Sequence, residues 1–189
     1  KAVVAFPSSL PYFKGKGVVL GNPVREEFYS LPAKTRAARL AVLVFGGSQG
    51  SHVLNERVAA ALPLLAAAKD RVRLTHQTGT NDLDQVAAAY KASGFGDAEV
   101  AAYFPGMAAY FGRADLVVCR AGATTLAELI AARRAAILVP FAGASEDHVD
   151  PAGPEPIAPE VGVRDADGEI REAVAVEVAG AGHREARPG

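Results

Sequence analysis

The stretch "AVLVFGGSQGSHVLNERV", residues 41–58, passes from five apolar residues through a glycine-rich turn into a helix-like pattern. The apolar run, which begins at Leu40, predicts a buried strand over 40–45. Apolar residues then recur at helical spacing, which predicts a helix from Ser51 to Ala68. The stripe consists of Leu54, Val58, Ala61, Leu62 and Leu65. A strand that turns directly into a helix is typical of parallel α/β sheets.

The turn at 46–50 predicts a particular class of ligand. A phosphate-cradling P-loop needs a Lys before its Ser or Thr, and "GGSQGS" contains no Lys. The dinucleotide fingerprint needs G-x-G-x-x-G and an acidic residue after the next strand, whereas the next apolar stretch ends in His76 and Gln77. The turn therefore predicts a phosphate-bearing ligand other than ATP or NAD. The alternative is an ordinary strand-to-helix turn with Ser48 near the helix cap.

Short apolar runs alternate with helix-period segments as far as residue 140. The predicted strands are 72–76, 99–103, 115–120 and 135–140, and the predicted helices are 82–93, 107–113 and 124–132. This order predicts an α/β fold with a doubly wound parallel sheet and helices on both faces. Ligands of such sheets bind beyond the carboxyl ends of the strands.

The flanking segments differ in composition from this domain, which we assign to residues 40–148. Residues 1–39 are predicted to form an inter-domain link and entry segment, with one short strand in "VVLGNPVREEF" and a turn at 21–23. Residues 149–189 contain no Leu and no aromatic residue, and they are rich in Pro and Gly. Such a composition predicts an atypical, largely disordered tail.

Composition excludes several classes of function. The net charge of −1 and the absence of a basic block argue against a nucleic-acid partner. The single Cys119 fits a reducing compartment. No apolar run approaches the roughly 18 residues of a membrane span. The D-x-D tripeptides at 82–84 and 165–167 and the four His show no metal-ligand spacing. Since the sequence starts at Lys1, we expect a fragment.

A second small-residue turn, Gly122-Ala123-Thr124, precedes the last predicted helix. Two helix starts with free N–H groups in one parallel sheet suit a diphosphate. Simple helix caps are the alternative interpretation for this turn.

Glu128 and Arg25 also allow two interpretations each. The Glu128 carboxylate can accept hydrogen bonds from two vicinal ribose hydroxyls, or it can merely interact with the helix dipole. Arg25 is either a cation held near the phosphates or a surface partner of Glu26 or Glu27.

Five segments in order resemble the donor half of the MurG family: "GNPVREEF", "FGGSQGSHVLNE", "HQTG", "DLVVCRAGATTLAEL" and "AAILVPF…DH". These are inverting UDP-N-acetylglucosamine:N-acetylmuramyl-(pentapeptide) pyrophosphoryl-undecaprenol N-acetylglucosaminyltransferases of peptidoglycan synthesis. The resemblance covers residues 1–148 and implies a Rossmann-like, UDP-sugar-binding domain, the second of two in a GT-B type glycosyltransferase. It implies transfer of GlcNAc from UDP-GlcNAc to lipid I, which gives lipid II.

The resemblance also implies roles for individual residues. Arg25 matches the arginine near the donor phosphates, Glu128 the carboxylate that holds the ribose, and Phe104 the position whose backbone reads the uracil edge. The implied UDP-GlcNAc-binding residues are Arg25, Gly47, Ser48, Gln49, Gly50, Phe104, Gly122, Ala123, Thr124 and Glu128. The catalytic base and the lipid-binding groups are expected in an N-terminal domain outside this sequence. Neither a cofactor nor a metal is implied.

Two departures from the family pattern are visible. "YFPGM" at 103–107 replaces the usual F-I-D-D-M, so that Pro105 removes one backbone N–H near Phe104. Val149 follows His148 where the family has a Gln that contacts the donor sugar. We expect that contact to be lost, and the abrupt change suggests a shift of reading frame.

The resemblance further implies a cytoplasmic protein that associates peripherally with the inner face of the plasma membrane, with UDP-GlcNAc and lipid I as partners. Two alternatives stay open. One is a non-catalytic nucleotide-sugar-binding remnant, and the other is a different UDP-sugar enzyme such as an epimerase.

Overall fold

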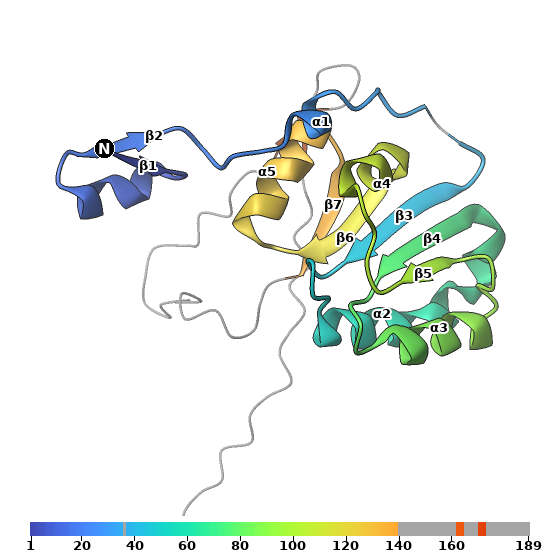
Figure 1. The fold of residues 1–189 in the computed structure, drawn as a ribbon. Helices are drawn as coiled ribbons and strands as arrows, with labels where there is room; N and C mark the ends of the chain where they lie inside the picture. The colour runs from blue at the N-terminus through green and yellow to red at the C-terminus, as the bar shows by residue number, and fades with distance from the viewer. Residues whose placement is uncertain (36, 140–161, 165–169, 173–189) are drawn as a thin grey trace, which may run out of the picture.

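The computed structural model describes residues 1–35, 37–139, 162–164 and 170–172 (Figure 1). Its centre is a parallel sheet of five strands in the order β5-β4-β3-β6-β7. These are β3 (Leu40–Phe45), β4 (Val72–Gln77), β5 (Glu99–Ala101), β6 (Leu116–Arg120) and β7 (Ala135–Val139). The predicted α/β class with a doubly wound parallel sheet is confirmed.

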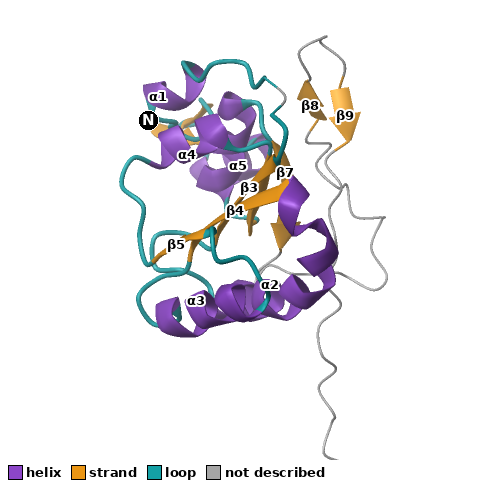
Figure 2. Cartoon of the chain, turned by 90° about the vertical axis from the view of Figure 1, so that its right-hand side faces the viewer, coloured by secondary structure: helices purple, strands orange, loops and turns teal. Residues whose placement is uncertain are grey.

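Helices cover both faces of this sheet, as Figures 1 and 2 show. On one face lie α2 (His52–Leu65) and α3 (Leu83–Ala92), and on the other α1 (Glu26–Tyr29), α4 (Met107–Arg113) and α5 (Ala123–Ala132). Strand side chains alternate between the two layers. In β3, Leu43 and Phe45 belong to the core that includes Phe28, Phe111 and Leu129, which come from α1, α4 and α5. Val42 and Val44 belong to the core of α2 and α3.

The predicted helix over 51–68 is shorter in the structure. Helix α2 ends at Leu65, and the chain tightens into the 3₁₀-helix η2 (Ala66–Arg71). Leu54 and Leu62 are buried as predicted, but Leu65 is 40% exposed, so its expected burial is wrong. The α-helix ends at this residue, and the apolar stripe ends with it. The predicted strand over 99–103 also stops early, at Ala101.

Residues 1–20 form a separate small unit (Figure 1). The strands β1 (Ala2–Val4) and β2 (Gly17–Val19) pair in parallel, with the 3₁₀-helix η1 (Pro7–Phe13) between them. Only the second of these strands is predicted from the sequence, although both are three residues long. Among the described residues, no helix is both long and apolar enough to cross a membrane.

The predicted disordered tail falls largely outside the described residues. Its described parts are β8 (Gly162–Arg164) and β9 (Ile170–Glu172), which pair antiparallel. His148 and Val149, where the sequence departs from the family pattern, also lie outside the described residues.

Arg134 connects several segments by hydrogen bonds at the amino-terminal end of the sheet's strands. It is only 4% exposed and precedes β7 directly. Its guanidinium donates to the carbonyls of Phe111 (2.7 Å), Ala132 (3.0 Å) and Pro32 (3.2 Å). The guanidinium of Arg134 therefore connects the last turns of α4 and α5 to the 30–39 segment. The carboxyl end of a helix is a favourable position for a positive charge.

Candidate functional site

The loops that carry the predicted ligand-binding residues meet at one edge of the sheet. All five strands are parallel, so their carboxyl ends lie together. The turn 46–50 follows β3, residues 78–79 follow β4, residues 102–106 follow β5, and residues 121–122 follow β6. This is the edge at which α/β proteins bind ligands.

The Gly47–Gly50 segment is a tight turn with an exposed tip. The Gly50 N–H donates to the Gly47 carbonyl over 3.1 Å, so that Ser48 and Gln49 occupy the tip. The cap of α2 is Ser51, whose Oγ accepts the Leu54 N–H at 3.5 Å. The segment is thus a tight strand-to-helix turn, as the alternative interpretation had it, but the residue that caps α2 is Ser51 and not Ser48.

Glycine is required where this turn meets the loop after β4. Gly50 has φ +81°, and a Cβ added there would lie 2.0 Å from the Thr78 carbonyl oxygen. Gly79 has φ +79°, and its Cβ would lie 2.1 Å from the Gln49 carbonyl oxygen. The backbones of the 47–50 turn and of the loop after β4 therefore approach each other too closely for a side chain at either glycine, and each restricts the position of the other.

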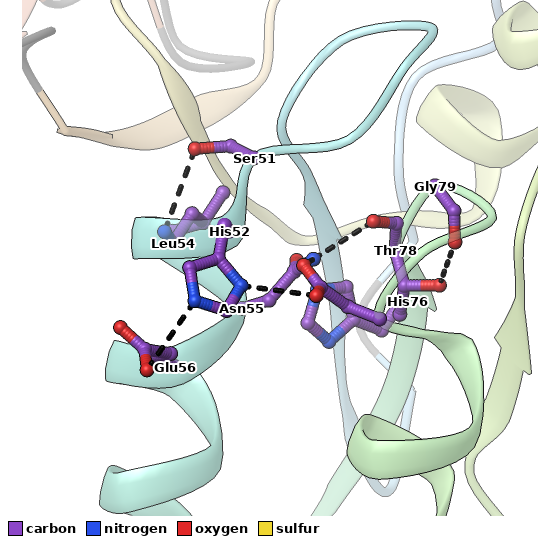
Figure 3. Close-up of polar contacts among 9 residues, drawn as sticks. Ser51, His52, Leu54, Asn55, Glu56, His76, Thr78 and Gly79 are labelled. Carbon is purple, nitrogen blue, oxygen red and sulfur yellow. Dashed lines mark hydrogen bonds and ion pairs between the residues drawn. The ribbon is translucent and has the colours of Figure 1, made fainter.

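A buried polar network lies beneath these turns (Figure 3). The Asn55 Nδ2 donates to the Thr78 carbonyl (2.8 Å) and to Asp82 Oδ2 (2.7 Å). Because its amide hydrogens are used, Asn55 Oδ1 accepts from His76 Nε2 at 3.0 Å. His76 Nδ1 then accepts from the Tyr90 hydroxyl at 3.2 Å. Burial lowers the pKa of His76 to about 4, which agrees with a neutral imidazole.

His52 extends this network to the surface. Its Nδ1 lies 2.9 Å from Asp82 Oδ1, and its Nε2 lies 3.5 Å from Glu56 (Figure 3). The hydrogen bond and charge of Asp82 raise the pKa of His52. The Asn55 and His52 hydrogen bonds in turn lower the pKa of Asp82. The starts of α2 and α3 are therefore held together below the glycine turn.

The second predicted turn leaves backbone donors available. Gly122 caps α5 without a side-chain hydrogen bond, and the first bond to its carbonyl comes from the Leu126 N–H (2.9 Å). The N–H groups of Ala123, Thr124 and Thr125 have no helical acceptor, as at any helix start. This helix start therefore offers donors and a positive dipole end to an anion.

Arg25 and Glu128 come together although 103 residues separate them. The Arg25 guanidinium donates to Glu128 Oε1 over 3.0 Å and also lies 3.3 Å from Glu27. The Glu128 side chain is 12% exposed and that of Arg25 is 54% exposed. Glu128 lies beyond the first turn of α5. At that distance from the helix start, the helix dipole interacts only weakly with a carboxylate. The dipole interpretation of Glu128 is therefore weak, whereas the predicted pairing of Arg25 with Glu27 is confirmed.

Phe104 is held on two sides. Its ring is stacked on Tyr110 with centroids 4.3 Å apart, and its N–H donates to Gln77 Oε1 at 2.8 Å. No described residue donates to the Phe104 carbonyl. If this backbone reads a base, the carbonyl is the group left for it.

A cavity of about 730 Å³ lies elsewhere, below the 30–39 segment and against α4. Its lining includes Ala41 and Arg73, which lie near the amino-terminal ends of β3 and β4, away from the carboxyl edge. Two of its cations are already paired, Arg39 with Asp97 (2.7 Å) and Lys34 with Asp115 (3.5 Å). None of the predicted ligand-binding residues lines it, so we place the site at the carboxyl edge.

The sequence analysis missed three residues that shape this edge: Asn55, Gln77 and Asp82. For Gln77 the signal was present in "HQTG", where two polar residues end the strand directly before a glycine turn. Gln77 is 1% exposed and Asn55 is equally buried. Polar side chains are buried at this depth only when their hydrogen bonds are satisfied, and here the partners are the ligand-side loops.

Comparison with known proteins identifies the family of this domain. The description "Glycosyltransferase family 28 C-terminal domain" matches residues 41–151. The chain is 48% identical over 151 residues to the UDP-N-acetylglucosamine--N-acetylmuramyl-(pentapeptide) pyrophosphoryl-undecaprenol N-acetylglucosamine transferase of Anaeromyxobacter sp. (strain Fw109-5). It is 45% identical over 149 residues to the protein of the same name from Solibacter usitatus (strain Ellin6076).

These matches cover 78% of this chain but 39% and 41% of the two relatives, so the chain spans about two fifths of their length. The crystal structure of Acinetobacter baumannii MurG superposes with a TM-score of 0.57 at 28% identity. That superposition covers 78% of this chain and 46% of the MurG chain. Because the family description matches more than half of the sequence, the chain belongs to glycosyltransferase family 28 and carries its C-terminal domain.

Proposed function

We propose that this chain is the donor-binding part of a transferase that moves GlcNAc from UDP-GlcNAc to undecaprenyl-pyrophosphoryl-MurNAc-pentapeptide. The observation that carries the proposal is the identity of 45–48% to transferases of that name over 149–151 residues. The family description covers residues 41–151, which include the turns after β3 and β6. Lipid I would bind to another part of the protein, which would act at the inner face of the cytoplasmic membrane.

The two helix starts would bind the diphosphate. The turn 47–50 and the first turn of α5 follow β3 and β6, which are neighbouring strands. The N–H groups of Ser48 and Gln49 have no described backbone acceptor, whereas that of Gly50 is bonded to Gly47. The dipole of α5, which begins at Ala123, also favours negative charge at its start. Gly47, with φ +99° and nothing within 4 Å of an added Cβ, leaves open space above the turn.

Glu128 would accept hydrogen bonds from the two ribose hydroxyls. Its partner Arg25 holds the carboxylate in one orientation while leaving the second oxygen free of any described ion pair. Thr124 lies one turn earlier on the same face of α5, because residues four apart in a helix are neighbours. The same helix would therefore contact both the phosphates and the ribose.

The Phe104 carbonyl would select the base. Since its N–H is donated to Gln77, the free carbonyl accepts a hydrogen bond but offers none. Uracil carries an N–H at the position where cytosine carries only an acceptor. This difference predicts that UDP binds more tightly than CDP.

In the transfer, an acceptor hydroxyl would attack the anomeric carbon as the bond to UDP breaks, with inversion at that carbon. Negative charge then grows on the departing diphosphate, where helix N-termini and Arg25 stabilise it. The hydroxyl proton would pass to a base outside this chain. We therefore expect the isolated chain to bind UDP but not to catalyse transfer.

Calorimetric titration of the chain with UDP, CDP and ADP tests the binding half of the proposal. We expect UDP to bind most tightly, and equal or absent binding of all three contradicts it. The second half is tested with UDP-GlcNAc and a lipid I analogue. Turnover by this chain alone would refute a base located elsewhere, and release of an epimer without acceptor would indicate an epimerase instead.

A further inference from the structure

Gln77, the last residue of β4, hydrogen-bonds to the loops on both sides of its own strand. Its Nε2 donates to the Gly47 carbonyl over 2.9 Å, and its Oε1 accepts the Phe104 N–H at 2.8 Å. Gly47 follows β3 and Phe104 follows β5, and these strands flank β4 in the sheet. One buried amide therefore ties the glycine turn to the 102–106 loop.

Both halves of the amide are needed at this position. The Gly47 carbonyl requires a donor, and the Phe104 N–H requires an acceptor. Asn, Gln and a protonated carboxylic acid present both on one planar group, and neutral His does so on a larger ring. Asn is shorter than Gln by one methylene. A carboxylate would keep the bond to Phe104 but place a second oxygen against the Gly47 carbonyl.

On the basis of the proposed function, we infer that Gln77 is a positioning residue which sets the separation between the diphosphate turn and the base-side loop. Gln77 touches no ligand atom itself. With the bridge in place, the two loops hold the two ends of one UDP moiety at the same time. Without it, each loop settles independently, and UDP must order them as it binds.

Three variants test this inference by calorimetry with UDP. Gln77→Met removes both hydrogen bonds at similar length, and Gln77→Glu removes only the donor at neutral pH. Arg134→Met is the matched control, because Arg134 is also buried and hydrogen-bonded but lies at the opposite end of the strands. We expect a roughly tenfold weaker UDP affinity for both Gln77 variants, about 1.4 kcal/mol. Arg134→Met should bind UDP normally below its melting temperature.

The pH dependence separates positioning from general loss of structure. In Gln77→Glu, protonation of the acid restores a donor toward Gly47. Burial at this position, where Gln77 is 1% exposed, raises the pKa of a carboxyl above its usual value of about 4.3. The UDP affinity of Gln77→Glu relative to the unmutated chain should therefore recover as the pH is lowered from neutral toward that pKa, whereas the Gln77→Met ratio should stay constant. If Gln77→Met does not fold, Gln77→Glu carries the test alone.

A ligand-free measurement distinguishes failure of this inference from failure of the proposed function. Amide hydrogen exchange at Phe104 should accelerate in Gln77→Met by more than its loss of global stability explains, and in Arg134→Met by no more than that loss explains. If the unmutated chain does not bind UDP, the proposed function fails, and unchanged exchange at Phe104 would overturn the positioning role as well. If UDP binds equally to the unmutated chain and to Gln77→Met, the inference fails while the proposed function stands.

Discussion

Replacing Glu128 by Gln separates a ribose-binding carboxylate from a merely structural one. The substitution keeps the shape of the side chain and removes its charge. If the carboxylate accepts hydrogen bonds from both ribose hydroxyls, the substitution weakens hydrogen bonds to a charged group. Such bonds contribute about 1.5–3 kcal/mol. The expected result is a UDP affinity reduced by about tenfold to a hundredfold, at 1.4 kcal/mol for each factor of ten.

The effect of the same substitution on stability should be small. The Arg25 side chain that pairs with Glu128 is 54% exposed, and ion pairs of that kind contribute about 0–1 kcal/mol. Glu128 also lies outside the first turn of α5, so its interaction with the helix dipole adds little. A thermal melt of the variant should therefore stay close to that of the unmutated chain.

The assay is calorimetric titration of UDP and 2′,3′-dideoxy-UDP into Glu128→Gln and Glu27→Gln. Glu27 is a matched control because it also pairs with Arg25, at 3.3 Å, but from α1. The dideoxy ligand should bind the unmutated chain and Glu128→Gln almost equally. Tight UDP binding by the unmutated chain with the same affinity in Glu128→Gln would remove Glu128 from the site.

Three further predictions concern the scaffold of the site. Burial depresses the pKa of His76 from 6.5 to about 4, so the unfolded chain binds a proton first as the pH falls. As the pH falls from about 6.5 to about 4, the free energy of unfolding should therefore decrease by up to about 1.4 kcal/mol per pH unit. Urea titrations at several pH values should find a smaller slope in His76→Gln. Gly50→Ala should lower the free energy of unfolding by at least about 1–3 kcal/mol, because the φ of Gly50 is +81° and an added Cβ would meet Thr78. Gly96→Ala, where an added Cβ has open space, should leave the free energy of unfolding nearly unchanged in thermal melts of both variants. Arg134→Met should lower the free energy of unfolding by roughly 3 kcal/mol, since several carbonyls lose a charged donor; a loss below about 0.5 kcal/mol would contradict this.

The sequence was sufficient for the sheet and for the ligand-side turns. Short runs of mostly apolar residues predict strands β3, β6 and β7, and helix-period segments follow β3 and β6. Glycines between a strand and a helix likewise indicate a turn with free N–H groups. Both kinds of signal lie within a few residues of the feature that they predict.

Contacts between distant segments had no such signal. The bond from the Phe104 N–H to Gln77 joins residues 27 apart, and the pair of Arg25 with Glu128 joins residues 103 apart. Each contact depends on strand order and loop path, which periodicity does not encode. Leu65 was likewise expected to lie on the buried stripe, because the apolar spacing does not mark the point at which α2 gives way to η2.

The central claim is that the diphosphate of UDP binds between the turn after β3 and the start of α5. The most direct measurement is an NMR titration of the ¹⁵N-labelled chain with UDP. We expect the amide resonances of Ser48, Gln49, Gly50, Ala123 and Thr124 to shift together with one dissociation constant. Shifts confined to residues such as Arg73 and Ala41, which line the cavity at the opposite end of the strands, would contradict it.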